Sequence, residues 1–581
     1  MIRQNPPSYT KGCQALDNIA KQALDTARNR LLMIGALFLV AFTVIGARLI
    51  GLTMMHDGHE PRLVQATELG TLKRERADIL DRNGILLATS LRTHWLYAHP
   101  QQILDVDEAV DKLKSVLPNL DEKLARSRLA SDRSFVWIYR HLTPRQKYAV
   151  NSLGILGLDF QNEEKRIYPH RNLTAHVLGF SGNDHHGLAG VEHFMNKELR
   201  GSSEPIRLSL DIRVQSILHE ELSRAHQHHQ AVGSAGLMMD TRNGEVLALV
   251  SLPDFDPNNP QNRDGEAFFN RATLGVYEMG STFKIFTVAM ALESGTVGLD
   301  GGYDATEPIR RGRFTISDHH PRGRWLSVPE ILIHSSNIGA AKMASDVGTT
   351  GQRAFLGKLG LLSPASIELP EVGEPLVPSP WSELNTMTVA YGHGLAISPV
   401  QLVTGAAAMV NGGILYPATL FPRAPKETGK DERPPETGEP GSRVLSPEIS
   451  EQVRRLMRVV VAEGTGKKAE VNGYLVGGKT GTAEKLVNGD YSTKALLSSF
   501  VSAFPMTAPR YVLFVMLDEP KGIKKTNGYA TGGWVAAPVA RRVISRTGPL
   551  LGILPVDEGA PEVQRKMFVD VTPRGPSRVS Y

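Results

Sequence analysis

An apolar run behind a serine is the feature that most constrains how this chain can fold. After Lys284, the segment Met279–Glu293 is almost entirely apolar, and Gly295 follows it closely. Gly280 interrupts the chain before the run, and Ser281 stands where helix N-terminal residues are favoured. The pattern predicts a buried helix over Met279–Glu293 with a hydroxyl held at its N-terminus.

Lys284 lies three residues after Ser281, which places both side chains on one face of a helix. A serine hydroxyl needs a neighbouring base to become a good nucleophile. A lysine can be that base only if burial or nearby positive charge lowers its pKa. The spacing S-x-x-K also arises by chance, and Ser8–Lys11 is a second occurrence in this chain. The tetrapeptide alone therefore does not define a site.

Two further motifs follow the first one in order. Ser335-Ser336-Asn337 gives S-x-N, and Lys479-Thr480-Gly481-Thr482 gives K-T-G. S-x-x-K, S-x-N and K-T-G occur together in penicillin-binding proteins and serine β-lactamases. The chain resembles the class B penicillin-binding proteins, the membrane-anchored peptidoglycan transpeptidases, along most of its length. Ser181-Gly182-Asn183 also fits S-x-N, but it precedes the serine and is interpreted as a turn.

The resemblance implies a catalytic role for the first two motifs. Lys284 would deprotonate Ser281, which would attack the carbonyl of a D-Ala-D-Ala stem peptide and form an acyl-enzyme. Ser335 would relay a proton to the departing amine, and Asn337 would bind Lys284 and the substrate amide. The backbone N–H groups of Ser281 and Thr482 would hold the oxyanion. A helix cap is the alternative interpretation of the S-x-N motif.

The same resemblance implies that the K-T-G motif binds substrate. Lys479 would supply positive charge that helps to keep Lys284 neutral. The hydroxyls of Thr480 and Thr482 would bind the terminal carboxylate, and Gly481 would let the substrate backbone approach the strand. An exposed hairpin strand is the alternative interpretation of this segment.

Composition excludes several other classes of protein. With 581 residues, 41% hydrophobic and 22% charged, the chain is long enough for two or three globular domains. Of its net charge of +5, residues 1–30 carry +3, so the remainder is nearly neutral and a nucleic-acid partner is not expected. The only cysteine is Cys13, so no intramolecular disulfide can form.

Neither a metal nor a cofactor is expected. None of the histidine clusters has a metal-binding signature such as H-E-x-x-H; they are His185-His186, His226 with His228-His229, and His319-His320. Gly464-Thr465-Gly466-Lys467 lacks the first glycine of a phosphate-binding loop, because Val461 stands at that position.

Residues 31–55 predict a transmembrane helix. The segment carries one charged residue, Arg48, which lies close enough to one end to reach the membrane interface. A cleaved signal peptide and a buried core helix are the alternatives, but the segment is long, lacks an A-x-A-like site and has no polar face. The basic tail of residues 1–30 would then lie in the cytoplasm and everything after residue 56 outside it.

Residues 57–205 are interpreted as a non-catalytic, elongated pedestal of mixed composition. Arg76–Gly84 resembles the family segment R-G-x-I-x-D-R-x-G, with Ala77 in place of the glycine. The segments Arg166–Phe180 and Gly187–Glu192 resemble later signatures of the same module. Pairing of Asp with Arg at the base of the pedestal is the expected role of these residues.

Residues 206–556 are predicted to form the transpeptidase domain, and residues 557–581 a tail. A strand at Leu208–Asp211, a helix at Ile212–His226 and a hairpin turning at Asn243-Gly244 begin the domain. Helices are expected at 327–334 and 338–344, and strands at 474–485, 495–504 and 510–517. One antiparallel sheet flanked by helices, as in serine β-lactamases, fits this order. Residues 421–441 are rich in Pro, Glu, Lys and Gly and are expected to be a mobile insertion.

These expectations describe a multidomain α+β enzyme of the inner membrane with a periplasmic catalytic domain. The resemblance implies a β-lactam-inhibited D,D-transpeptidase for septal cell-wall synthesis, because Tyr391–Leu395 and Ser398–Leu402 resemble the division-specific member. Its implied partners are peptidoglycan stem peptides, a glycosyltransferase of the SEDS family and other division proteins. The alternatives are an elongation-specific transpeptidase, a D,D-carboxypeptidase, a β-lactamase, and a non-catalytic divisome scaffold or β-lactam-sensing receptor.

Overall fold

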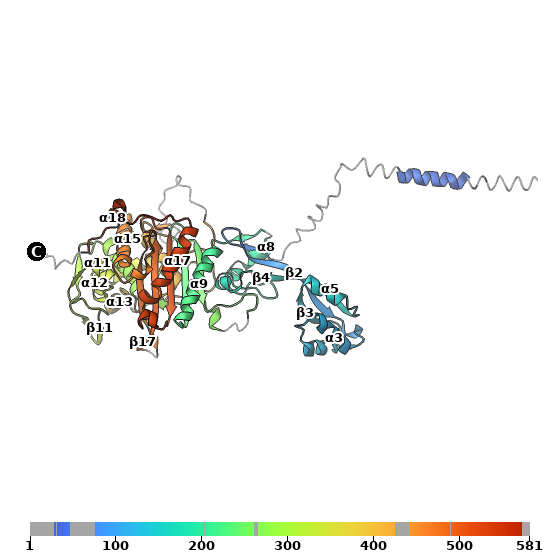
Figure 1. Cartoon of the computed structure of the whole chain (residues 1–581), viewed down its shortest axis with the longest axis horizontal. Coiled ribbons are helices and arrows are strands. Elements are labelled where there is room, and N and C mark those ends of the chain that lie inside the picture. The colour runs from blue at the N-terminus through green and yellow to red at the C-terminus, as the bar shows by residue number, and fades with distance from the viewer. Residues whose placement is uncertain are drawn as a thin grey trace, which may run out of the picture. The chain divides into compact units, whose positions relative to one another are not determined.

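The structure is a computed structural model that describes residues 28, 30, 32–46, 76–202, 204–260, 265–423, 441–487 and 490–571 (Figure 1). The chain divides into two compact units, residues 1–73 and 74–581. In the first unit, residues 32–46 are helical and their large apolar side chains are exposed. Among the described residues, no helix has both the length and the apolar character needed to span a bilayer. Residues 31 and 47–55 of the predicted span lie outside the described residues.

The second unit begins with a sheet built on the long strand β2 (Leu86–Ala98). This strand pairs antiparallel with β1 (Ile79–Leu80), β3 (Val136–Leu142) and β4 (Leu158–Ile167). Helices α3 (Val106–Val116), α4 (Glu122–Leu129) and α5 (Pro144–Asn151) share one hydrophobic cluster with β2 and β3. The mixed helix and strand content predicted for residues 57–205 is therefore confirmed for its described part.

Buried ion pairs hold the base of this module together, but through a different acid from the one predicted. Both Arg76 and Arg166 pair with the fully buried Glu192, the latter through Nε at 2.7 Å from Oε1. Asp81 instead accepts hydrogen bonds from the backbone N–H groups of Asn83 at 2.7 Å and Ile85 at 2.8 Å. Asp81 thus lies in the turn and closes it, and the buried carboxylate that pairs with the two arginines is that of Glu192. Loss of one partner of such a buried pair typically costs about 3–5 kcal/mol.

The rest of the unit is organised around a five-stranded antiparallel sheet in the order β16-β17-β18-β6-β7. The hairpin of β6 (Gly233–Asp240) and β7 (Val246–Leu252) confirms the turn predicted at Asn243-Gly244. The three last strands are also confirmed; they are β16 (Gly477–Val487), β17 (Asp490–Phe504) and β18 (Tyr511–Asp518). Strand β16, which carries the K-T-G motif, lies at the edge of the sheet.

Helices cover both faces of this sheet, as predicted (Figure 1). Alternate residues of β18 point to opposite faces, so Leu513 and Val515 pack with helices α9 (Ile212–His228) and α17 (Ala537–Leu550). Val512 and Phe514 join the cluster on the other face. That cluster includes residues of helices α10 (Lys284–Glu293), α12 (Asn337–Lys358), α14 (Pro399–Val410) and α15 (Pro447–Ala462).

Two boundaries differ from those expected. The strand predicted at Leu208–Asp211 is wrong, because β5 covers only Ile206–Arg207 and Asp211 caps α9 by accepting a hydrogen bond from the Arg213 N–H. The segment predicted as a tail contains helix α18 (Pro561–Met567), whose Met567 side chain is buried. Residues 424–440 of the predicted insertion and residues 572–581 lie outside the described residues.

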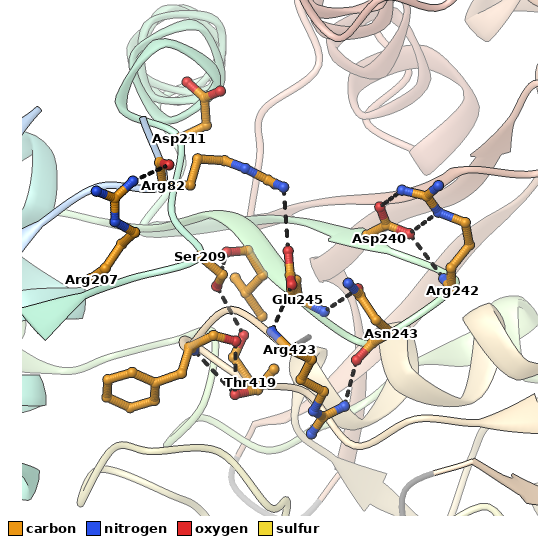
Figure 2. A network of polar contacts seen from close by, with 12 residues as sticks. Arg82, Arg207, Ser209, Asp211, Asp240, Arg242, Asn243, Glu245, Thr419 and Arg423 are labelled. Atoms are coloured by element: carbon orange, nitrogen blue, oxygen red, sulfur yellow. Dashed lines mark hydrogen bonds and ion pairs between the residues drawn. The ribbon is translucent and has the colours of Figure 1, made fainter. Parts of the chain in front are cut away.

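A polar network joins the first module to the turn of the β6–β7 hairpin (Figure 2). Arg82 reaches Glu245 with Nη2 at 3.3 Å from Oε2, and the other Glu245 oxygen accepts a 2.9 Å hydrogen bond from the Arg423 backbone N–H. Arg423 Nη1 also donates to the Pro417 carbonyl at 3.0 Å. Glu245 is therefore the common acceptor for a residue of the first module and a residue of the part of the chain that contains the five-stranded sheet.

Candidate functional site

Ser281 lies in a short 3-10 turn, η4 (Gly280–Phe283), and not at the N-cap of an α-helix. The predicted helix over Met279–Glu293 is therefore confirmed only from Lys284 onward. The reason is the crowding around Gly280, which has φ +55° and donates its N–H to the Gly392 carbonyl at 3.1 Å. A Cβ at Gly280 would lie 2.8 Å from the Thr482 carbonyl oxygen, so only glycine fits between these segments.

Lys284 reaches four oxygen atoms from the first turn of α10, where it is fully buried. Its Nζ lies 2.6 Å from the Ser335 carbonyl, 2.7 Å from Asn337 Oδ1, 3.0 Å from Ser281 Oγ and 3.1 Å from Ser335 Oγ. Burial lowers the pKa of Lys284 well below its ordinary value, and the charge of Lys479 lowers it further.

A neutral Lys284 has two N–H donors and one lone pair. The two shortest contacts, to the Ser335 carbonyl and to Asn337 Oδ1, are to acceptors and take both N–H groups. The lone pair is then left for a hydroxyl, and Ser281 Oγ is the nearer one at 3.0 Å. This arrangement is that of a base poised to take the proton of Ser281.

The two serines of the S-x-N motif make different contacts. Ser336 is the N-cap of α12, where its Oγ accepts a 3.0 Å hydrogen bond from the Gly339 N–H. Ser335 has the left-handed φ of +59°, which lets both its carbonyl and its hydroxyl face Lys284. The cap interpretation is therefore confirmed for Ser336, whereas the catalytic role expected of Ser335 stays a prediction.

Asp318 was not singled out by the sequence analysis, yet it holds the whole S-x-N segment. Its Oδ2 accepts from Ser336 Oγ at 2.7 Å, and its Oδ1 accepts from the backbone N–H groups of Asn337 at 2.6 Å and Ile338 at 3.0 Å. A lone aspartate in a loop carries no periodic signal, so nothing in the sequence marks this partner. Its carboxylate also opposes the lowering of the Lys284 pKa.

Lys479 enters the site from β16 and is also fully buried. Its Nζ donates to Ser335 Oγ at 3.0 Å and to the Thr480 carbonyl at 3.1 Å. The Ser335 hydroxyl thus lies between the two lysines, with contacts of 3.1 and 3.0 Å. Burial lowers the pKa of Lys479 from 10.5 to about 7. Its charge was expected to depress the Lys284 pKa, and it does so, although burial of Lys284 is the larger cause.

The other K-T-G residues are held by neighbours that sequence reasoning missed. Thr480 Oγ1 lies 2.7 Å from Thr465 Oγ1, and Thr482 Oγ1 accepts a 3.1 Å hydrogen bond from the Gly532 N–H. Because that contact uses only a lone pair, the Thr482 hydroxyl can still donate to a substrate.

Gly481 is required by packing inside the domain. A Cβ there would lie 2.3 Å from Ser499 Oγ on β17 and 2.8 Å from the carbonyl oxygen of Met279, the residue before η4. A side chain at this position would therefore collide with both segments. The prediction had attributed this glycine to the approach of substrate. The missing signal is the close contact between β16 and η4, which no local pattern reveals.

Comparison with known families identifies the chain. A model described as the penicillin-binding protein transpeptidase domain matches residues 234–545, and one described as the penicillin-binding protein dimerisation domain matches residues 71–228. The chain belongs to the class B penicillin-binding proteins.

Relatives span most of this penicillin-binding protein. The probable peptidoglycan D,D-transpeptidase FtsI of Caulobacter vibrioides is 39% identical over 492 residues, which are 82% of each chain. The peptidoglycan D,D-transpeptidase FtsI of Escherichia coli K12 is 29% identical over 80% of this chain and 82% of its own. A crystal structure of penicillin-binding protein 3 from Mycobacterium tuberculosis in complex with aztreonam covers 83% of this chain and 97% of its own, with a TM-score of 0.64 and 23% identity, and so shares the fold.

The domain match and these relatives make this protein a penicillin-binding serine transpeptidase. All five predicted catalytic residues belong to one hydrogen-bonded cluster; they are Ser281, Lys284, Ser335, Asn337 and Lys479. In the described part of the chain, no group of three or more His, Cys, Asp or Glu side chains is placed to hold a metal ion.

Proposed function

We propose that this protein is a peptidoglycan D,D-transpeptidase that cross-links stem peptides during septal cell-wall synthesis. The observation that carries the proposal is the buried Lys284 amine, 3.0 Å from Ser281 Oγ, with both of its N–H groups taken by other acceptors. A buried, neutral amine beside an accessible serine is what formation of an acyl-enzyme requires.

In acylation, Lys284 takes the proton of Ser281 as Oγ attacks the carbonyl carbon of the penultimate D-alanine. The N–H groups of Ser281 and Thr482 hold the oxyanion of the tetrahedral intermediate. When the C–N bond breaks, the leaving D-alanine nitrogen receives a proton from Ser335, which is replaced by the proton that Lys284 gained. The 3.1 Å contact between Lys284 Nζ and Ser335 Oγ supports this route.

The terminal carboxylate of the donor would bind at Thr480 and Thr482, next to the Lys479 ammonium. Because burial brings the pKa of Lys479 to about 7, this lysine is only partly charged near neutral pH. An arriving carboxylate would favour the protonated form and thereby create its own counter-ion.

An acceptor amine completes the reaction by attacking the acyl-enzyme, with Lys284 taking its proton. The same intermediate would be hydrolysed by a β-lactamase, but that needs a base for water. Asp318 is the carboxylate considered as a base for water, but it already accepts three hydrogen bonds from Ser336, Asn337 and Ile338. This supports a long-lived acyl-enzyme and a transpeptidase instead of a β-lactamase.

We further propose that residues 31–55 anchor the protein in the inner membrane, with residues 1–30 in the cytoplasm and the transpeptidase domain in the periplasm. The apolar segment and the basic residues before it support this arrangement. A SEDS-family glycosyltransferase is the partner expected for such a single span. A reporter fused after Met55 should be active only outside the cytoplasm, and cytoplasmic activity would refute this topology.

The septal role is supported by two relatives named FtsI and by the resemblance of Tyr391–Leu395 and Ser398–Leu402 to the division-specific member. Depletion should therefore block septation and give filaments. Round, swollen cells would favour the elongation-specific alternative.

Intact-mass measurement of the full-length protein after incubation with benzylpenicillin tests the activity. One stable adduct is expected, and it should vanish in Ser281→Ala but persist in Ser8→Ala, which carries the other S-x-x-K match. An adduct on Ser281→Ala would refute the assignment of the nucleophile. Rapid turnover of penicillin would make the protein a β-lactamase, and release of D-alanine without cross-linked product would make it a carboxypeptidase.

A further inference from the structure

The chemistry of transfer places the acceptor on the side from which the leaving D-alanine departs. In acylation the C–N bond to that alanine breaks. In transfer the acceptor nitrogen forms a new C–N bond to the same carbon, and the bond to Ser281 Oγ breaks. Because transfer retraces acylation, the acceptor nitrogen takes the position of the leaving nitrogen and passes its proton back through Ser335 to Lys284. In the function proposed above, the carbonyl is held at the Thr482 N–H and the leaving carboxylate reaches Thr480, so the acceptor stem enters from beyond Thr480.

Two short helical segments form the surface beyond Thr480; they are η5 (Lys467–Ala469) and α16 (Gly532–Val535). The exposed Thr465, just before η5, has its Oγ1 2.7 Å from Thr480 Oγ1. A Cβ at Gly533 of α16 would lie 3.6 Å from Thr480 Cγ2 and 2.7 Å from the Thr465 carbonyl oxygen. Both segments therefore continue the site on the side of the leaving group.

An aromatic pair and a lysine are packed together on this surface. The half-buried Trp534 follows Gly533, and Lys468 Nζ lies 3.9 Å from the centroid of its ring. Tyr529, which is 54% exposed, stacks on Trp534 with centroids 5.4 Å apart and an interplanar angle of 18°. A cation over an indole ring is attracted by the ring and held in place. The Lys468 ammonium therefore loses less conformational freedom on binding an anion than a free lysine would.

The charge around this pair is positive. Tyr529 donates its backbone N–H to the carbonyl of the last residue of η6 (Lys524–Thr526) at 2.9 Å, which brings η6 close to the stack. The neighbouring acidic residues are Glu463 and Glu470, and Glu470 pairs with Arg458 at 2.6 Å. Four exposed lysines form no ion pair within the described residues; they are Lys467, Lys468, Lys524 and Lys525. This local excess of positive charge attracts an anion to the surface beyond Thr480.

The acceptor stem supplies the matching anion. It belongs to the same polymer as the donor, so its chain also ends in a carboxylate, close to the side chain that carries the attacking amine. We propose, building on the function proposed above, that the surface formed by Lys467, Lys468 and Trp534 binds the acceptor stem. The two lysines hold its C-terminal carboxylate, and the face of Trp534 supports its main chain.

The test compares acceptor dipeptides with and without this carboxylate. Nα-acetyl-lysyl-D-alanine and Nα-acetyl-diaminopimelyl-D-alanine are each supplied as the free acid and as the C-terminal carboxamide, together with a pentapeptide donor ending in D-Ala-D-Ala and the full-length protein. Mass spectrometry measures the ratio of cross-linked to hydrolysed donor. For the acceptor that reacts, this ratio should be about 2- to 5-fold higher with the free acid, the range for an exposed ion pair.

Salt gives a second readout of the same contact. Raising the salt concentration from about 0.1 M to about 1 M should bring the free acid and the carboxamide together, because it screens exposed charges. Equal ratios for the two forms at about 0.1 M salt would overturn the proposal.

Variants locate the effect on the lysines. The double variant Lys467→Gln, Lys468→Gln should bring the acid-to-carboxamide preference close to 1, whereas Lys123→Gln, which changes an exposed lysine of α4, should keep the wild-type preference. An unchanged preference in the double variant would place the carboxylate elsewhere, such as at the K-T-G motif, and refute the assignment. Benzylpenicillin labelling reports whether each variant is folded. If the double variant is not, the two single variants decide.

The two proposals fail in different ways. Absence of benzylpenicillin labelling on the wild-type protein would refute the proposed catalytic function. Normal labelling and D-alanine release without transfer to either acceptor would make the protein a carboxypeptidase and refute both proposals. Normal labelling and transfer with equal ratios for acid and carboxamide would leave the function intact and refute only the acceptor site.

Discussion

Replacing Lys479 with methionine should stabilise the protein at neutral pH. Methionine is apolar and of similar length, so it removes a buried titratable group without leaving a large void. The pKa of Lys479 is about 7 in the folded protein against an ordinary value of 10.5. The buried amine binds a proton less tightly than the same amine in the unfolded chain. At every pH at which the unfolded chain is protonated, folding therefore costs free energy.

The magnitude follows from this difference at 1.36 kcal/mol per pH unit. The folded pKa lies below the unfolded one, so the cost is full below pH 7 and disappears as the pH rises past 10.5. It is about 4 kcal/mol at pH 7 and less than about 1 kcal/mol at pH 10. Loss of the hydrogen bonds to Ser335 and Thr480 offsets about 1–3 kcal/mol of the gain in Lys479→Met.

Differential scanning calorimetry at pH 7, 8, 9 and 10 measures this effect. The transition that shifts when the wild-type protein is acylated by benzylpenicillin is that of the transpeptidase domain. The melting temperature of Lys479→Met should exceed that of the wild type at pH 7, and the difference should shrink, or change sign, by pH 10. A difference that stays constant or grows over this range would refute the argument that burial of Lys479 is unfavourable.

Three further results are expected. Lys284→Ala should slow acylation by benzylpenicillin about 10²- to 10⁴-fold, the usual contribution of a general base, and a smaller loss in stopped-flow kinetics would contradict its role. In the wild type, the two oxygens of Asp318 accept three hydrogen bonds from the start of α12. Asp318→Asn should therefore slow acylation and speed hydrogen exchange in the first turn of α12. Unchanged exchange would show that Asp318 does not hold this segment. The second-order rate constant of acylation should fall above pH 7 as Lys479 loses its proton, and Lys479→Arg should move this limb upward; an identical limb in both would exclude Lys479 as its source.

Local patterns predicted the elements that carry the site. The apolar run behind Ser281, the Asn243-Gly244 turn and the three last strands all follow from periodicity and turn chemistry, and each is present in the fold. The order of the three motifs was enough to indicate the family.

Contacts between distant segments could not be predicted in this way. The interaction of Asp318 with the S-x-N segment, and the pairing of two arginines with Glu192, join residues that share no spacing rule. Gly481 was singled out from the sequence, but the reason that a glycine is needed there is the approach of β16 to Met279, which only the folded chain reveals. The 3-10 turn at Ser281 has the same origin, because the carbonyls of Gly392 and Thr482 constrain Gly280.

The open edge of β16 is a risk to the protein as well as a means of binding. An unpaired strand edge offers backbone N–H and C=O groups to any extended chain, including a second copy of the same protein. A covalent adduct at Ser281 covers this edge, whereas in the free enzyme the edge stays open to a second copy of the protein. Concentrated, unacylated protein should thus aggregate more readily than its benzylpenicillin adduct, and purification with the inhibitor bound should give the more homogeneous sample.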